Sequence, residues 1–178
     1  MILAVGRLVA RKGYMTLLRA MPKILENHPG ARLVIVGRGH MKKRLLKNAK
    51  KLAIEHALFI RSSMPFDELA QHFRSADLVV YPSYYEGQGL IPLESLASGT
   101  PVVTVDHAPL TEMVDQTVGD LFQSGDSNDL ANSVCRILDS PKQRVDKAKA
   151  GRKRVLSKYT YDHNSDDFQS IYQSIMKN

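Results

Sequence analysis

The chain alternates short runs of β-branched and aliphatic residues with longer stretches of helical periodicity. Strands are predicted at 2–6, 32–36, 57–60, 77–81, 101–105 and 119–122. Helices are predicted at 14–27, 41–55, 66–75, 90–98, 110–114 and 128–138, and then throughout the C-terminal region. This alternation is typical of a parallel sheet, because each connection between parallel strands needs a helix-length crossover. The sequence therefore predicts an α/β fold with about six parallel strands and helices on both faces.

Length and composition indicate one globular domain over residues 1–178. The chain is 43% hydrophobic, enough for a sizeable core. Its single cysteine, Cys135, lies in an apolar helical stretch, so no disulfide framework is possible and a reducing compartment fits. No apolar run approaches the ~18 residues of a membrane span, and no signal segment precedes the first strand. We therefore expect a cytoplasmic protein.

Two basic runs carry most of the positive charge. Residues 27–54 and 142–158 each hold eight Lys or Arg, and Asp146 is the one acid within them. Neither run interleaves cations with aromatic residues, so no nucleic-acid partner is expected. In the first run the apolar residues recur at helical spacing and leave the lysines outside: Met41, Leu45, Leu46, Ala49, Leu52 and Ala53. A solvated face is the simpler interpretation, and a peripheral contact with an anionic membrane or lipid is the alternative.

Open parallel sheets bind ligands at the carboxyl ends of their strands, where loops lead into helices. Four such loops are predicted here: "RLVARKG", "GRGH", "RSSMP" and "PSYYEGQG". All four are polar and three contain Arg or Lys. The sequence therefore predicts a polar, mostly cationic ligand edge.

The stretch "YYEGQGLIPLESLASGTPVV" carries the clearest chemistry. Gly87 and Gly89 let the backbone approach a ligand without side-chain obstruction. The helix predicted to follow them has free amides in its first turn, which attract an anion such as phosphate. Glu86 on the loop and Glu94 on the helix are acceptor-only groups that match pairs of sugar hydroxyls. Together these features indicate a ligand that contains sugar, phosphate and sugar.

Two cations in the first loop complement this ligand. Arg7 directly follows the first strand, and Lys12 comes five residues later. A planar guanidinium and a compact ammonium together suit a diphosphate. The chain has no Asp-x-Asp pair and no His or Cys cluster with metal-ligand spacing. We therefore expect no metal and no cofactor, with the cations stabilising charge on a departing diphosphate.

Three segments, in this order and at these separations, resemble a known family. "VGRLVARKG", "LVIVGRGH" and "ADLVVYPSYYEGQGLIPLESLASGTPVV" are similar to the C-terminal, donor-binding domain of retaining glycosyltransferases of family 4, a GT-B group that uses nucleotide sugars. The resemblance covers nearly the whole chain and implies a Rossmann-like domain. It also implies that the N-terminal, acceptor-binding domain of the same enzyme is absent from this chain. On that basis we expect the isolated domain to be inactive alone.

The resemblance implies where the phosphates of the donor bind. Arg7 and Lys12 would hold the diphosphate and stabilise its charge during the reaction. Backbone amides near Gln88, Gly89 and Leu90 would contact phosphate. The implied partner is therefore a nucleotide-sugar donor, bound without a metal.

The two carboxylates have separate implied roles. Glu86 would contact hydroxyls of the transferred sugar, as a positioning group and not as a nucleophile, and Glu94 would bind the ribose diol. The loop at 61–64 would lie near the base. The implied reaction moves a hexose to a sugar or lipid-linked acceptor with retention, with a donor phosphate oxygen helping to deprotonate the acceptor.

Several residues depart from the family pattern. Gln88 stands where phenylalanine is usual, and Arg38 where an acid is common. Gly37 and Gly39 do not complete a dinucleotide motif, because Lys42 occupies the place of the third glycine, so a nicotinamide site is not expected. Two alternatives therefore stay open: a GT-B hydrolase or epimerase of nucleotide sugars, and a non-catalytic nucleotide-binding or interaction module.

Overall fold

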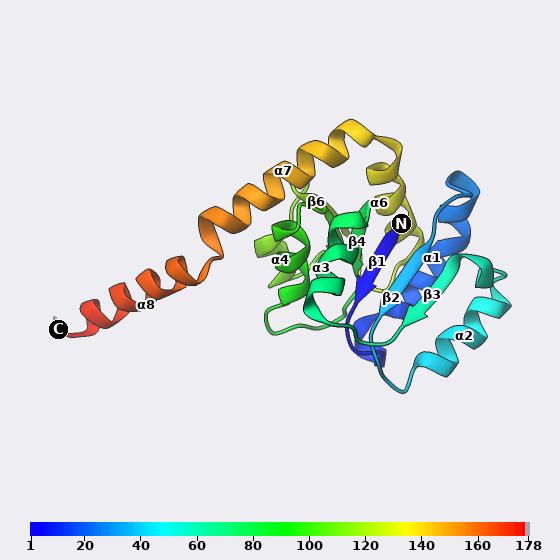
Figure 1. The fold of residues 1–178 in the computed structure, drawn as a ribbon, viewed down its shortest axis with the longest axis horizontal. Helices are drawn as coiled ribbons and strands as arrows, with labels where there is room; N and C mark the ends of the chain where they lie inside the picture. Colours follow the sequence, from blue (N-terminus) through cyan, green and yellow to red (C-terminus); the bar gives the residue numbers. More distant parts are fainter. Residues whose placement is uncertain (177–178) are drawn as a thin grey trace.

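The computed structural model describes residues 1–176 and contains one six-stranded parallel sheet (Figure 1). Its strands run in the spatial order β3-β2-β1-β4-β5-β6. Their bounds are β1 (Ile2–Val5), β2 (Leu33–Val36), β3 (Leu58–Arg61), β4 (Leu78–Tyr81), β5 (Val102–Val105) and β6 (Gly119–Phe122). All neighbouring pairs are parallel. This is the Rossmann-like strand order, so the predicted fold class is confirmed.

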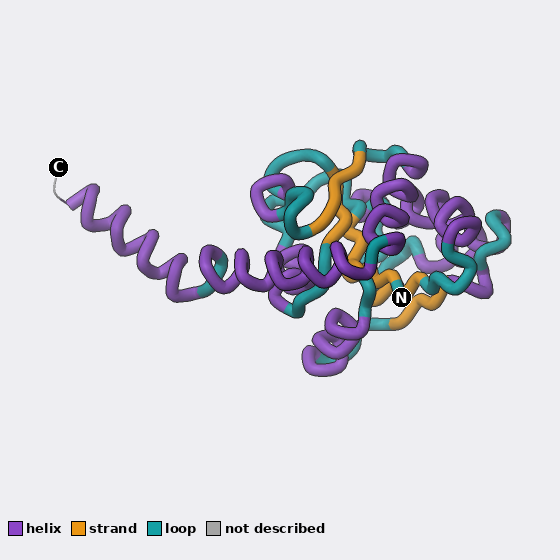
Figure 2. The backbone as a smooth tube through the Cα atoms, turned by 90° about the horizontal axis from the view of Figure 1, so that it is seen from above, coloured by secondary structure: helices purple, strands orange, loops and turns teal. Residues whose placement is uncertain are grey.

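Helices cover both faces of the sheet, as Figure 2 shows. The chain before β3 contains α1 (Tyr14–Asn27) and α2 (Lys42–Lys51). It also contains two 3-10 turns, η1 (Ala10–Lys12) and η2 (Glu55–Ala57). The rest of the chain contains α3 (Phe66–Ser75), α4 (Leu90–Ala97), α5 (Leu110–Met113), α6 (Ser127–Asp139), α7 (Pro141–Lys158) and α8 (Tyr161–Met176). Helices α1, α2 and α6 lie on one face, and α3, α4 and α5 on the other.

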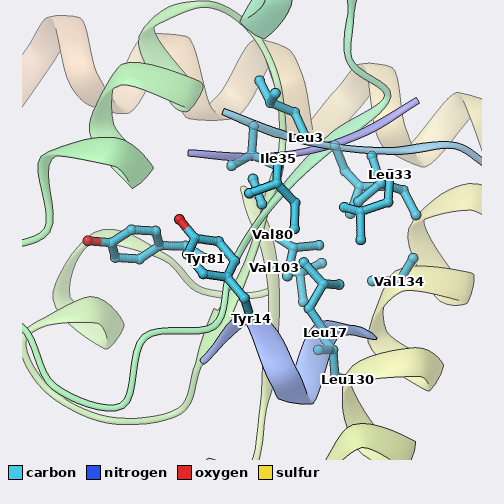
Figure 3. Close-up of a cluster of buried hydrophobic side chains, with 14 of the residues drawn as sticks. Leu3, Tyr14, Leu17, Leu33, Ile35, Val80, Tyr81, Val103, Leu130 and Val134 are labelled. Atoms are coloured by element: carbon cyan, nitrogen blue, oxygen red, sulfur yellow. The ribbon is translucent and has the colours of Figure 1, made fainter. Parts of the chain in front are cut away.

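The core lies between the sheet and these two helical layers. Every residue of β1, β2, β4 and β5 is buried, because helices cover both sides of these strands. Figure 3 shows part of this core, where Leu17 of α1 and Val134 of α6 lie with Val80 and Val103 of the sheet. The edge strand β3 is less covered, and Phe59 there is 49% exposed.

The second helix differs from its prediction in length and in its buried stripe. It ends at Lys51 instead of residue 55, because Ala53, two residues later, has a left-handed φ of 55°. Leu46 was expected in the buried stripe but is 46% exposed. It lies one residue, about 100° around the helix, from the buried line formed by Leu45 and Ala49.

The long helices α7 and α8 end the described part of the chain. Helix α7 packs against α4 so closely that a Cβ on Gly151 would lie 2.6 Å from the Leu96 side chain. Helix α8 then projects away from the domain (Figure 1). Its apolar side chains are exposed: Tyr161, Phe168, Ile171, Tyr172, Ile175 and Met176. Within residues 1–176, no helix combines the length and the apolar character needed to cross a membrane.

Candidate functional site

The order of the strands reverses between β1 and β4, which pair directly in the centre of the sheet. From β1 the sheet continues through β2 and β3, and from β4 it continues the other way through β5 and β6. Loops that leave two such strands diverge and open a crevice at their carboxyl ends. The "RLVARKG" loop and the "PSYYEGQG" loop lie here, at the edge where the sequence predicts the ligand.

These two loops pack against each other through their backbones. Gly13 has a φ of 67°, and a Cβ placed on it would lie 1.8 Å from the Pro82 carbonyl oxygen. Only glycine allows both. The Tyr84 amide donates to the Arg11 carbonyl oxygen over 2.8 Å. The basic loop after β1 is thereby held against the acidic loop after β4.

Lys12 and Glu86 form an ion pair at the centre of this contact, with 2.5 Å between Nζ and Oε1. Each of the two side chains is only 10% exposed. Lys12 Nζ also donates to the Tyr81 hydroxyl over 2.7 Å and lies 4.8 Å from the centroid of its ring. Glu86 Oε1 accepts a further hydrogen bond from the Ser83 hydroxyl, and the Arg11 guanidinium lies 3.8 Å from it. The structure therefore brings two predicted site residues into direct contact.

The contacts around Glu86 determine its charge state. Burial alone would raise the pKa of its carboxyl, but the hydrogen bonds that it accepts, from Lys12 above all, outweigh burial and lower that pKa. Burial and the nearby Glu86 charge raise the pKa of Tyr81 and of Tyr14 well above the usual range. At neutral pH the cluster therefore contains an ionised carboxylate beside two neutral hydroxyl groups.

Arg7 lies apart from this ion pair. It borders a hollow of about 280 Å³ formed by the ends of β1 and β2, the loop after β3 and α3. Arg38, Ser63 and Met64 also line this hollow. Among the described residues, no hydrogen bond or ion pair joins the Arg7 side chain to another group. The loop at 61–64 therefore borders the same hollow as Arg7.

The glycines of "GRGH" serve the packing of the first two loops. A Cβ on Gly37 would lie 1.9 Å from the Gly6 carbonyl oxygen, and one on Gly39 would lie 2.4 Å from the Leu8 carbonyl oxygen. The Met41 amide donates to that same Leu8 oxygen over 3.0 Å. These glycines are thus required by contact between protein backbones.

Helix α4 begins at the crevice. Gly89 precedes it with a φ of 83°, and a Cβ there would lie 2.8 Å from the Leu110 side chain, so packing itself requires glycine. No side chain caps the helix, which leaves the amides of its first turn available to an anion. Gly87 has open space around it, and Gln88 and Leu90 are exposed. The predicted phosphate-binding backbone is therefore exposed at Gln88 and Leu90, while Gly89 between them is buried.

Glu94 lies in the second turn of α4 and is half-buried. Burial raises the pKa of its carboxyl. Within residues 1–176 its side chain makes no hydrogen bond or ion pair. An unpaired, half-buried carboxylate is costly, so this group is suited to accept hydrogen bonds from a ligand.

Another hollow lies at the start of β6. It has a volume of about 550 Å³, and Asp120, Arg136 and Lys147 are among its lining residues. These charges are already engaged: Arg136 pairs with Asp120 at 2.7 Å, and Lys147 donates to the Gly119 carbonyl oxygen over 2.9 Å. We therefore assign the site to the crevice. No group of three or more His, Cys, Asp or Glu that could hold a metal gathers anywhere in residues 1–176.

Sequence reasoning missed three members of the cluster. Tyr81 was predicted only as the end of a strand, and no role was predicted for Ser83 or Arg11. Side-chain alternation along β4 gives Tyr81 and Val79 the same face of the sheet but does not indicate an ion-pair partner. The sequence does not predict a role for Arg11, because it does not show which of the two adjacent cations, Arg11 or Lys12, turns inward.

This geometry and the sequence agree with one family. The Glycosyl transferases group 1 family matches residues 1–154. The chain belongs to this family. Its fold corresponds to the C-terminal domain of GT-B glycosyltransferases, as the resemblance implied.

Individual relatives support the same assignment. The chain is 36% identical over 178 residues to an uncharacterized glycosyltransferase of Methanocaldococcus jannaschii. This alignment covers 99% of this chain and 45% of the relative. Sucrose-phosphate synthase from Thermosynechococcus elongatus superposes with a TM-score of 0.88 at 28% identity, over 99% of this chain and 45% of that one. The Anabaena protein HepE in complex with UDP superposes with a TM-score of 0.87 at 20% identity, over 97% of this chain and 48% of the other. The chain thus spans about half the length of these proteins.

Proposed function

We propose that this group 1 glycosyltransferase domain binds the donor of a retaining enzyme, which transfers a hexose from a nucleoside diphosphate sugar to a sugar or lipid-linked acceptor. The observation that carries the proposal is the Lys12–Glu86 pair, 2.5 Å apart at the point where the strand order reverses. A cation beside a carboxylate matches a ligand that has phosphate next to sugar hydroxyls. The UDP bound to HepE is the kind of ligand expected in this crevice.

The diphosphate would be bound by three groups of the crevice. Lys12 approaches from the β1 loop, Arg7 from the neighbouring hollow, and the uncapped amides at Leu90 from the start of α4. Glu94 would accept the ribose hydroxyls. Because its carboxylate has no partner among the described residues, these hydroxyls would replace the solvation that burial removed.

In the reaction itself, charge develops on the departing diphosphate. Lys12 and Arg7 would stabilise this charge electrostatically, in place of a metal ion. Glu86 is ionised, and Lys12, Ser83 and Arg11 all face the same oxygen, Oε1. A carboxylate held so firmly fits a group that positions sugar hydroxyls. A donor phosphate oxygen would then assist removal of the acceptor proton, with retention of configuration.

We propose that the acceptor is bound by another part of a longer protein. The chain spans about half of its relatives, and α8 carries an exposed apolar stripe that includes Phe168, Ile171, Tyr172 and Ile175. A stripe at this spacing normally packs against a partner. The isolated domain would accordingly transfer little sugar by itself.

We also propose that α2 contacts an anionic membrane near a lipid-linked acceptor. Its six cations are all exposed: Lys42, Lys43, Arg44, Lys47, Lys50 and Lys51. Leu46 is exposed among them, and within the described residues none of these side chains forms an ion pair. Replacing Lys43, Lys47 and Lys50 with Gln should weaken sedimentation with phosphatidylglycerol vesicles about 100-fold, at roughly 1 kcal/mol per charge. Replacing Lys142, Lys149 and Lys153 of α7 is the matched control, and equal losses in both variants would contradict the role of α2.

The donor proposal is tested by calorimetric titration of UDP, GDP and ADP into the protein. We expect one nucleotide to bind and Glu94→Gln to weaken it about tenfold, the effect of losing hydrogen bonds to a charged acceptor. Glu86→Gln should spare nucleotide affinity, because Lys12 keeps its charge, while it abolishes transfer in the full-length enzyme. Donor consumption without an acceptor would favour the hydrolase or epimerase alternative. Binding with no turnover of any kind would favour the non-catalytic module, and no binding would refute the proposal.

A further inference from the structure

The Lys12 ammonium has two of its three donors committed within the protein. One hydrogen bond goes to Glu86 Oε1 at 2.5 Å and one to the Tyr81 hydroxyl oxygen at 2.7 Å. An ammonium has three N–H donors and no acceptor. One donor therefore remains for a ligand oxygen, and its direction is fixed by where the other two point.

Tyr81 also interacts with Glu86. Hydrogen bonding by its hydroxyl is among the causes that lower the pKa of Glu86. Burial keeps the hydroxyl protonated at neutral pH. The hydroxyl oxygen accepts from Lys12, which leaves its proton available to Glu86, so one side chain can hold both members of the pair.

Tyr81 is the rigid member of this trio. It is 3% exposed and ends β4, and its carbonyl oxygen accepts a 2.9 Å hydrogen bond from the Thr104 hydroxyl on β5. Lys12 lies on a 3-10 turn and Glu86 on a loop, and loops are more mobile than the strands they follow. Figure 3 shows the labelled tyrosine rings with their hydroxyl oxygens on the side away from Leu130 and Val134.

We propose that Tyr81 is a positioning residue of the donor site, which anchors the Lys12 ammonium and the Glu86 carboxylate to the sheet so that each meets its part of the ligand. The inference rests on the proposed donor-binding function. Tyr81 itself does not touch the ligand. It acts through two side chains whose geometry it sets from a buried strand.

The test compares two tyrosine-to-phenylalanine variants. Tyr81→Phe removes the bridging hydroxyl and keeps the ring. Tyr84→Phe is the matched control, because its hydroxyl makes a hydrogen bond of the same 2.7 Å length, to Thr16, without touching the ion pair. We expect Tyr81→Phe to weaken binding of the best nucleoside diphosphate about tenfold, as for one lost hydrogen bond to a charged group, and Tyr84→Phe to change it less than twofold.

A second measurement needs no ligand. A carbon-13 NMR titration of labelled glutamate, with the Glu86 signal assigned from Glu86→Gln, should show a higher pKa for Glu86 in Tyr81→Phe and no change in Tyr84→Phe. A merely structural hydroxyl would lower the melting temperature without moving this pKa. Equal behaviour of the two variants in either measurement would overturn the inference. If no nucleotide binds the unaltered protein, the proposed function fails, whereas the NMR titration still decides whether Tyr81 holds Glu86.

Discussion

The two cations and two carboxylates predicted for the site fall into two sets that are built in opposite ways. Lys12 and Glu86 bond each other, are largely shielded from solvent, and share Tyr81 as a neighbour. Arg7 and Glu94 have no side-chain partner within residues 1–176, and Arg7 is exposed. We call Lys12 and Glu86 the closed pair and Arg7 and Glu94 the open pair, although all four residues were predicted separately from the same kind of sequence signal.

The difference separates stability from ligand affinity. A closed pair has its geometry before any ligand arrives, and removing one member leaves a buried charge without compensation. An open residue contributes little to folding and keeps its full electrostatic attraction for a ligand. Loss of Lys12 from the closed pair should therefore alter both properties, and loss of the exposed Arg7 should alter affinity alone.

The largest effect is expected from Lys12→Met, which removes the cation and keeps most of the volume. Glu86 then stays shielded without its main partner, so the free energy of unfolding should fall by roughly 2–4 kcal/mol in urea denaturation. Nucleotide affinity should fall about 100-fold, since a charged contact is lost. The double variant Lys12→Met with Glu86→Gln should recover much of the stability. An unchanged urea midpoint in the single variant would show that the closed pair does not stabilise the fold.

A smaller and more selective effect is expected from Arg7→Gln. Nucleotide affinity should drop about tenfold in calorimetry, while the free energy of unfolding stays within roughly 0.5 kcal/mol, as for other exposed sites. Arg19→Gln, an exposed arginine on α1, is the matched control and should change neither quantity. A large loss of stability in Arg7→Gln would erase the distinction between the closed and the open pair.

The two carboxylates should respond to pH in opposite directions. The pKa of Glu86 is lowered by folding, so its stabilisation is present above its unfolded pKa and is lost as pH falls through the folded value. The pKa of Glu94 is raised by folding, so its ionised form costs stability as pH rises through that value. Urea unfolding between pH 3 and 8 should therefore show less acid-induced loss in Glu86→Gln and a modest gain near neutral pH in Glu94→Gln. The same sign for both variants would contradict this assignment.

The smallest effect is expected from Tyr14→Phe. The Tyr14 hydroxyl is buried beside the closed pair yet has no hydrogen-bond partner among the described residues. Because an unsatisfied buried hydroxyl is unfavourable, its removal should leave the free energy of unfolding unchanged or raise it by up to about 1 kcal/mol. A clear destabilisation in thermal or urea unfolding would mean that a bound water or ligand normally satisfies this hydroxyl. The surroundings of the Lys12–Glu86 pair would then need that molecule to be fully hydrogen-bonded.

Much of the architecture could be predicted because the periodicity of the chain reports burial directly. The runs "ILAV" and "LVIV" are uniformly apolar since both of their faces are covered, and the structure has strands there. The ends of helices were predicted less accurately than the strands, because single backbone conformations decide them. At Ala53 a left-handed φ ends α2 before its predicted last residue. The exposure of Leu46 was also missed, because a helical stripe one residue wider still fits the sequence.

The sequence by itself determined the fold class, and it led us to propose which edge of the sheet holds the site and which residue types bind there. Periodicity, glycines and charges can be read from short stretches of sequence. Because open parallel sheets bind ligands at the carboxyl ends of their strands, these local features also predict where a ligand binds. Only the tertiary structure decided which charges meet. Lys12 and Glu86 are 74 residues apart in the chain and touch because β1 and β4 are neighbours, while Arg7 and Glu94 have no side-chain partner among the described residues. Pairing depends on distances of a few ångströms across separate loops, and no local pattern encodes those distances.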